Sequence, residues 1–273
     1  MPKLNTFVVA VMLLIAAYVS QARADPDSDI RAALAANERN DYATALKLLR
    51  PLADQGNALA QGMLGSMYAN AQGVPKDDAE AVRWSRKAAD QGFAPAQTFL
   101  GAMYSLGRGV PKDDAKAALW FRKAAEQGDI QAQATLGSRY HNGRGVPKDY
   151  KQAAFWYRKA AEQGAILGQH MLATMYLRGN GVPKDEAEGA RWIRKAAEQG
   201  SAEAQSFLGT LFSTGHGVPK DYVQAYMWFN LAAAGGDNTS AKNRDELEHL
   251  MTAEQIAEAQ RRTAAWQPTR SGK

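Results

Sequence analysis

One stretch of sequence, Gly73 to Gly92 (GVPKDDAEAVRWSRKAADQG), returns four more times at a spacing of 36 residues. The tetrapeptide Val-Pro-Lys-Asp stands at 74–77, 110–113, 146–149, 182–185 and 218–221. A Trp follows in each copy, at Trp84, Trp120, Trp156, Trp192 and Trp228. A fixed period without insertions is the signature of stacked supersecondary units. The chain of 273 residues is therefore expected to form one elongated array, stabilised by contacts between neighbouring repeats.

Each repeat reads as two helices, which we call helix A and helix B. In the first repeat, apolar residues at i, i+3, i+4, i+7 and i+8 predict helix A over 58–70. Asp77 is a suitable N-cap for helix B, which is expected to run to about Gln91. Gly92 suits the left-handed residue that follows a helix C-terminus. The predicted fold class is all-α, an α/α solenoid of stacked helix-turn-helix repeats of 36 residues.

Constant small and large residues predict how the helices pack. A Leu-Gly pair recurs inside helix A, as in Leu64-Gly65, and only the fourth repeat has Leu172-Ala173 instead. A Gly inside a helix costs about 1 kcal/mol relative to Ala, so close approach of a neighbouring backbone or of the Trp ring is expected to offset it.

The repeat pattern also divides the chain. Residues 25–56 form a degenerate capping helix pair, and five full repeats occupy 57–92, 93–128, 129–164, 165–200 and 201–236. Residues 237–273 supply C-terminal capping helices and a tail. Thr252 with Gln255 fits a capping box that opens the last helix, and Gln267 to Lys273 is expected to fray.

Residues 1–24 have the features of a secretory signal peptide. Lys3 precedes an apolar run of 13 residues, Phe7 to Val19, and Ala22-Arg23-Ala24 offers a cleavage site after Ala24. The run is shorter than the ~20 residues that span a bilayer, so the mature protein is expected to be periplasmic or secreted and not membrane-spanning. The mature chain would carry 31 basic and 28 acidic residues, a balance that does not favour nucleic acid as a partner.

The full pattern resembles a known family. It reads A-x-A-Q-x-x-L-G-x-x-Y, then G-x-G-V-P-K-D, then A-x-x-W-x-R-K-A-A-E-Q-G, as in Ala94–Gly128. This is similar to the Sel1-like repeat, a relative of the tetratricopeptide repeat, over about Asn57 to Gly236. The resemblance implies an α/α superhelix that holds other proteins together, in a family often exported by bacteria and implicated in envelope signalling, polysaccharide assembly and host contact. A cysteine-rich branch has been linked to β-lactam binding, from which this chain departs by having no cysteine.

The sequence offers no constellation for catalysis. Lack of cysteine excludes disulfides, thiolate chemistry and Cys-ligated zinc. The four histidines show no metal-binding spacing, and no G-x-S-x-G elbow is present. We therefore predict no catalytic residue, cofactor or metal, and keep a cell-wall amide hydrolase only as a less favoured alternative.

A basic edge is a second candidate surface. Stacking would align loop cations that could attract an acidic envelope polysaccharide or peptidoglycan, although the Asp after each loop Lys would partly neutralise them. The residues of this edge are Arg108, Lys112, Arg144, Lys148 and Lys184. Aromatic pairs such as Trp120-Phe121 could suggest sugar stacking, but their register in helix B favours the core.

The favoured binding surface is a groove along helix A. By analogy with tetratricopeptide repeats, helix A lines the concave side, where three positions in each repeat are nearly all small or hydroxylated. Such a groove would let a segment of a protein partner approach closely. Bulky or charged exceptions cluster in the third and fourth repeats. The predicted partner-binding residues are Ser138, Arg139, His141, His170, Thr174, Leu177 and Arg178.

Together these patterns predict an exported, non-catalytic scaffold or adaptor that binds a protein segment in a preformed groove, in envelope signalling, assembly or host contact. Binding an envelope polysaccharide through the basic edge is the alternative.

Overall fold

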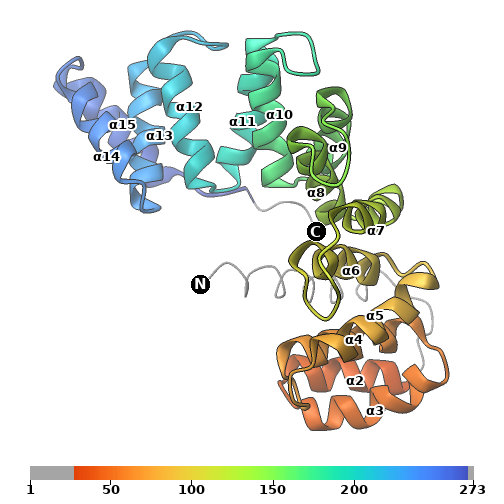
Figure 1. Ribbon diagram of the computed structural model, residues 1–273. Coiled ribbons are helices and arrows are strands. Elements are labelled where there is room, and N and C mark those ends of the chain that lie inside the picture. Colours follow the sequence, from red (N-terminus) through yellow and green to blue (C-terminus); the bar gives the residue numbers. More distant parts are fainter. Residues whose placement is uncertain (1–27, 270–273) are drawn as a thin grey trace. The chain divides into compact units, whose positions relative to one another are not determined.

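The computed structural model describes residues 28–269, which contain fourteen helices and no strand (Figure 1). The predicted signal peptide, residues 1–24, lies outside the described residues. The all-α repeat fold is confirmed. The helices are α2 (Ser28–Glu38), α3 (Tyr42–Asp54), α4 (Ala58–Asn70), α5 (Asp78–Asp90), α6 (Ala94–Leu106), α7 (Asp114–Glu126), α8 (Ile130–Asn142), α9 (Tyr150–Glu162), α10 (Ile166–Arg178), α11 (Glu186–Glu198), α12 (Ala202–Thr214), α13 (Tyr222–Ala234), α14 (Asn238–Glu248) and α15 (Ala253–Ala265).

Helix A of the five repeats corresponds to α4, α6, α8, α10 and α12, and helix B to α5, α7, α9, α11 and α13. The chain forms two compact units. The N-terminal unit holds the described residues up to Arg139 together with 143–147, and the C-terminal unit holds 140–142 together with 148–269. Within each unit, helix A packs on helix B of its own repeat, as α4 does on α5 and α12 on α13.

Local signals in the sequence set the helix ends. Asp77 accepts hydrogen bonds from the amides of Ala79 and Glu80, so it is the N-cap that its position predicts. Gly92 has a φ of +89°, in the left-handed region. The Thr252–Gln255 capping box is present in full. The observed bounds of α4, Ala58–Asn70, and of α5, Asp78–Asp90, agree with those predicted for helices A and B to within a residue.

Four of the five repeated Trp residues are buried and Trp156 is partly buried, and in the first, second and fifth repeats the residue after Trp approaches the helix-A glycine. Trp84 and Trp228 are buried. A Cβ added at Gly101 would lie 3.0 Å from the ring of Phe121, and one at Gly209 would lie 2.7 Å from the ring of Phe229. The expected close approach is present. At Gly65 it includes the backbone of helix B, with the carbonyl oxygen of Ala81 2.9 Å from an added Cβ, and at Gly101 and Gly209 the partner is the ring that follows Trp rather than Trp itself.

The fourth repeat exchanges the small residue between its two helices. Helix A carries Ala173 where other repeats have Gly, and helix B carries Gly189 where other repeats have Ala. A Cβ at Gly189 would lie 3.0 Å from the carbonyl oxygen of Ala173 and 2.7 Å from Cγ of Leu177. The missing side chain of Gly189 therefore makes room for the backbone of Ala173 and for the side chain of Leu177.

Candidate interaction surface

Two glutamines in each of the first four repeats, which the sequence analysis did not single out, link neighbouring helices along the stack. In helix A, the amide of Gln97 donates to the carbonyl oxygen of Ala89 at 3.0 Å, at the C-terminal end of α5. Gln127, at the end of α7, donates to the side-chain oxygen of Gln97 at 2.7 Å. The same pattern repeats with Gln61 and Gln91, and with Gln169 and Gln199. A buried polar residue at a fixed place on an otherwise apolar helix face was the signal that could have revealed this ladder.

An Arg–Tyr pair makes a second connection between repeats. Arg50 donates to the hydroxyl of Tyr68 at 2.8 Å, and Arg86 and Arg158 donate to Tyr104 and Tyr176. In the C-terminal unit, Arg194 lies over the ring of Phe212, with 5.3 Å between Cζ and the ring centroid. These constant cations therefore stabilise the stack.

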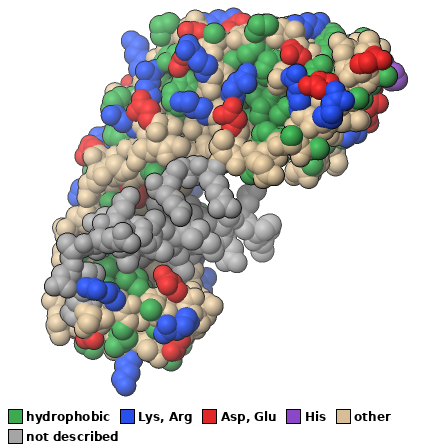
Figure 2. Space-filling model, turned by 180° about the vertical axis from the view of Figure 1, so that it is seen from behind, with side chains coloured by type: hydrophobic (Ala, Val, Ile, Leu, Met, Phe, Trp, Pro, Cys, Tyr) green, Lys and Arg blue, Asp and Glu red, His purple; other side chains and the backbone are tan. Residues whose placement is uncertain are grey.

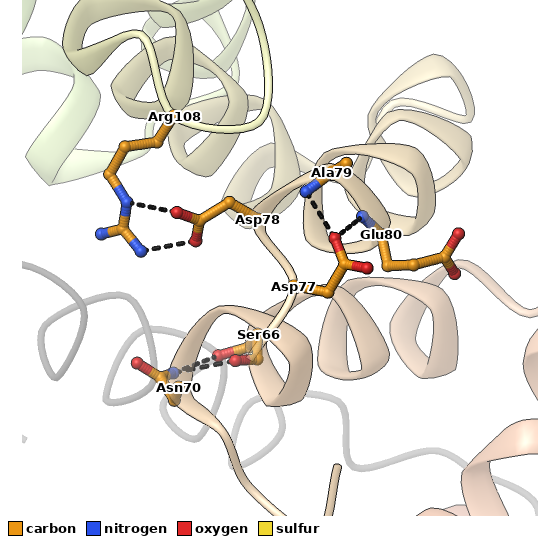
Figure 3. Close-up of polar contacts among 7 residues, drawn as sticks. All are labelled: Ser66, Asn70, Asp77, Asp78, Ala79, Glu80 and Arg108. Carbon is orange, nitrogen blue, oxygen red and sulfur yellow. Dashed lines mark hydrogen bonds and ion pairs between the residues drawn. The ribbon is translucent and has the colours of Figure 1, made fainter. Parts of the chain in front are cut away.

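The cations of the predicted basic edge are largely paired within the chain. Arg108 forms a bidentate ion pair with Asp78, with N–O distances of 2.9 and 2.5 Å (Figure 3). Asp78 is the first residue of the preceding helix B, α5. Asp77 beside it is occupied with capping the helix, as Figure 3 shows. The carboxylate that neutralises Arg108 is therefore Asp78, the residue after Asp77, which the sequence analysis had expected in this role.

The other members of the basic edge are placed as follows. Arg144 lies 3.7 Å from Asp114, and Lys184 pairs with Glu186 at 2.7 Å. The Lys148 ammonium lies 4.7 Å from the ring centroid of Tyr150, and Lys112 is exposed. On the face of the C-terminal unit that Figure 2 shows, basic and acidic side chains are interspersed and do not gather into a patch of one sign.

Two of the predicted partner-binding residues belong to the N-terminal unit. Ser138 is partly exposed. Arg139 is buried: its guanidinium donates to Asp114 at 3.2 Å and to the hydroxyl of Ser105 at 2.6 Å, and lies over the ring of Phe121. Burial lowers the pKa of Arg139, and the hydrogen bond with Asp114 opposes that shift. Arg139 thus occupies a core position, which other repeats fill with Met or Leu.

The remaining five predicted residues lie in the C-terminal unit. His141 meets the ring of Tyr150 edge-on, with centroids 5.2 Å apart. On α10, Thr174 donates to the carbonyl oxygen of His170 one turn earlier, and both side chains are partly exposed. Leu177 packs against Gly189 of α11, and Arg178 is exposed at the end of α10. That the seven residues form one binding surface stays a prediction.

An open hollow of about 550 Å³ lies in the C-terminal unit beside His170. Its walls come from α10, the first turns of α12 and the turn between α13 and α14. The lining residues are His170, Ala202, Glu203, Ser206, Phe207, Gly235, Gly236 and Asp237. His170 is the one residue of the predicted patch that lines it. Ser206 is one of the small helix-A positions that the sequence places along the groove, and the other six lining residues, from the fifth repeat and its C-terminal cap, were not singled out.

Residues 28–269 hold no group of three or more His, Asp or Glu side chains that could bind a metal ion. Over the same range, every helix is too short or too polar to cross a membrane.

The fold and these contacts define a helical-repeat protein in which constant residues join successive helix pairs. A family model for the Sel1 repeat matches residues 38–57, 58–93, 94–129, 130–164, 166–201 and 202–237. The chain belongs to the Sel1 repeat family, whose members are generally non-catalytic and mediate protein–protein interactions.

Two solved structures are similar to this chain. A protective antigen present in uropathogenic Escherichia coli strains is 38% identical, with a TM-score of 0.76, over 82% of this chain and 49% of its own. A Sel1 repeat protein from Oxalobacter formigenes is 32% identical, with a TM-score of 0.75, over 90% of this chain and all of its own. The chain thus spans about half the length of the E. coli antigen. A comparison with curated proteins finds no match.

Proposed function

We propose that this protein is an exported, non-catalytic scaffold that binds a segment of a protein partner along the helix-A face. The observation that carries the proposal is a division between constant residues, which pack between helices, and variable residues, which face outward. The constant Gln, Arg, Tyr and Gly positions are committed to contacts between helices, whereas the variable positions of α10 and α12 remain at least partly exposed. The latter are His170, Thr174, Ser206, Thr210 and Ser213.

The contacts on the basic edge weigh against polysaccharide as the principal ligand. Arg108, Arg144 and Lys184 each have a carboxylate partner, so their charge is partly compensated before any ligand arrives. A preformed face of small and hydroxylated side chains suits a protein segment better, because binding it would need little ordering of the scaffold.

The binding proposal is tested by crosslinking capture from envelope extract of the source cell, with residues 25–273 as bait. The blocking variant carries Thr174→Arg and Thr210→Arg, on α10 and α12. The matched control carries Gln152→Arg and Ala264→Arg, which add the same charge at exposed positions of α9 and α15. A protein captured by wild type and control but lost from the blocking variant supports the proposal. Equal capture by all three baits overturns the assignment of the surface.

Export is supported by the signal-peptide pattern of residues 1–24. The E. coli relative is described as a protective antigen, which also suits a protein exposed outside the cytoplasm. We expect the protein from the source cell to begin at Asp25 and to fractionate with the periplasm or the medium. N-terminal mass spectrometry checks this, and a cytoplasmic protein that retains residues 1–24 would contradict it.

A further inference from the structure

We infer that the hollow between α10, α12 and the α13–α14 turn receives an Arg or Lys side chain from the partner segment. The inference deepens the proposed function and rests on it, because it assigns the chemistry of one anchoring residue in the bound segment.

The lining of the hollow carries two carboxylates and no Lys or Arg. Asp237 accepts hydrogen bonds from the hydroxyl of Ser240 at 2.7 Å and from the amide of Thr239 at 3.1 Å. Hydrogen bonds from Ser240 and Ser206 lower the pKa of Asp237, so this carboxylate is charged at neutral pH. Glu203 has a side chain that is 81% exposed, so it can turn toward an incoming cation. The hollow is thus locally acidic on a chain whose formal net charge is +5.

An aromatic wall stands beside these carboxylates. The rings of Phe207 and His170 lie 5.7 Å apart at their centroids, tilted by 46°. Nδ1 of His170 is 3.6 Å from Oε1 of Glu203, which brings that carboxylate to the same wall. A carboxylate next to an aromatic face is a favourable environment for a guanidinium or ammonium group, which can pair with one and stack on the other.

The hollow exists because the fifth repeat departs from the pattern of the others. Gly235 stands where other repeats have Gln, and Gln199 at that position donates to Gln169 of the preceding helix A. The φ of Gly235, −79°, is open to any residue, but a Cβ there would lie 2.9 Å from Cβ of Ala202, so the close approach of α12 keeps this position small. Glu203 stands where other repeats carry uncharged Leu59, Pro95, Gln131 and Leu167. One substitution therefore removes a side chain from this site, and the other supplies a negative charge.

The test selects displayed random 12-residue peptides on residues 25–273 and measures affinities of the selected peptides. The decisive variant is Glu203→Gln with Asp237→Asn, which removes both charges while Asn keeps the ability to cap α14. We expect selected peptides to be enriched in Arg or Lys, and the variant to bind them at least about tenfold more weakly. Replacing the enriched Arg by Gln in the peptide should weaken its affinity for wild type by a similar factor. The same replacement should hardly change the affinity for the variant, because the change in the peptide and the change in the protein remove the same interaction.

Each other outcome has a distinct meaning. Peptides that bind without Lys or Arg enrichment, or losses that simply add, overturn this inference and leave the proposed function standing. Failure to select any peptide, or binding that Thr174→Arg with Thr210→Arg does not weaken, overturns the proposed function and this inference with it. Tighter peptide binding by a chain that ends at Thr269 would mean that Arg270 or Lys273 fills the hollow, and would overturn the choice of a partner as the source of the cation.

Discussion

At the scale of single residues, the ladder of Gln hydrogen bonds is the clearest case of a repeated sequence position that joins one helix pair to the next. We expect Gln97→Leu to lower the free energy of unfolding by about 1–3 kcal/mol, because it removes both the buried hydrogen bond from Gln97 to the carbonyl oxygen of Ala89 and the hydrogen bond that Gln127 donates to Gln97. Urea unfolding followed by circular dichroism measures the loss. Gln152→Leu on the exposed surface of α9 is the control, with an expected change within about 0.5 kcal/mol. Equal effects would show that the ladder is not stabilising.

The ion pair between Arg108 and Asp78 gives a residue-scale prediction about pH. Hydrogen bonding to Arg108 lowers the pKa of Asp78 below its usual value. The pair therefore stabilises the fold above the unfolded pKa of about 3.9, and this contribution is lost as pH falls through the lower folded-state pKa. Asp78→Asn should cost about 1 kcal/mol or less at pH 7, since the pair is partly exposed.

Unfolding midpoints of wild type and Asp78→Asn, compared at pH 7 and near pH 2.5, check this. The difference should shrink at the lower pH, because the Asp78 carboxylate takes up a proton as pH falls toward and through its lowered folded-state pKa. Asp90→Asn, at the exposed end of α5, serves as the control and should show little difference at either pH. A gap for Asp78→Asn that is unchanged at low pH would mean that its effect is not due to the charge.

The structural role of a residue could be predicted from the sequence where that role depends only on residues close to it along the chain. Asp77, Gly92 and Thr252 are examples, because capping and left-handed turns depend only on neighbouring residues. Gln97 and Arg139 were missed or interpreted differently because their partners lie 30 and 25 residues away. Arg139 was expected at a binding surface because it interrupts an apolar column, whereas Asp114 and Ser105 allow it to remain in the core.

At the scale of elements, the distance between helices A and B depends on which helix carries the small residue. Gly209→Ala should destabilise the fifth repeat by about 1–3 kcal/mol although Ala favours the helix, because its methyl would meet the ring of Phe229. The fourth repeat has Ala173 and Ile193 at these two positions. Phe229→Ile should therefore relieve part of the strain when combined with Gly209→Ala.

A double-mutant cycle with these two substitutions measures the coupling between α12 and α13. We expect the double variant to be more stable than the sum of the single effects by about 1 kcal/mol. Additive losses would show that Phe229 does not limit the approach of the two helices. The need for a small residue in helix A was predictable from the recurring Leu-Gly pair. The ring that requires it was not, because Trp is constant on helix B whereas the residue after it varies between repeats.

At the scale of the whole molecule, the C-terminal tail contacts the stack and does not fray at once after α15. Trp266 meets Trp228 edge-on at 6.3 Å, and the amide of Thr269 donates to the carbonyl oxygen of Glu198 at 2.7 Å. The tail therefore reaches back to the end of α11, two helix pairs earlier. Periodicity could not reveal this contact, because the tail lies beyond the last copy of the repeat.

Ending the chain at Ala265 should selectively weaken the C-terminal unit. The truncation removes an aromatic pair worth about 0.5–1.5 kcal/mol beyond its burial and one hydrogen bond at the end of α11. Because stability in a repeat array depends on nearest neighbours, amide hydrogen exchange should accelerate in α11 and α13 and stay unchanged in α4 and α6. A chain that ends at Thr269 keeps both contacts and should exchange like the full chain. Equal acceleration in both units would instead show that the array unfolds as one cooperative body, in which a contact at one end stabilises every repeat.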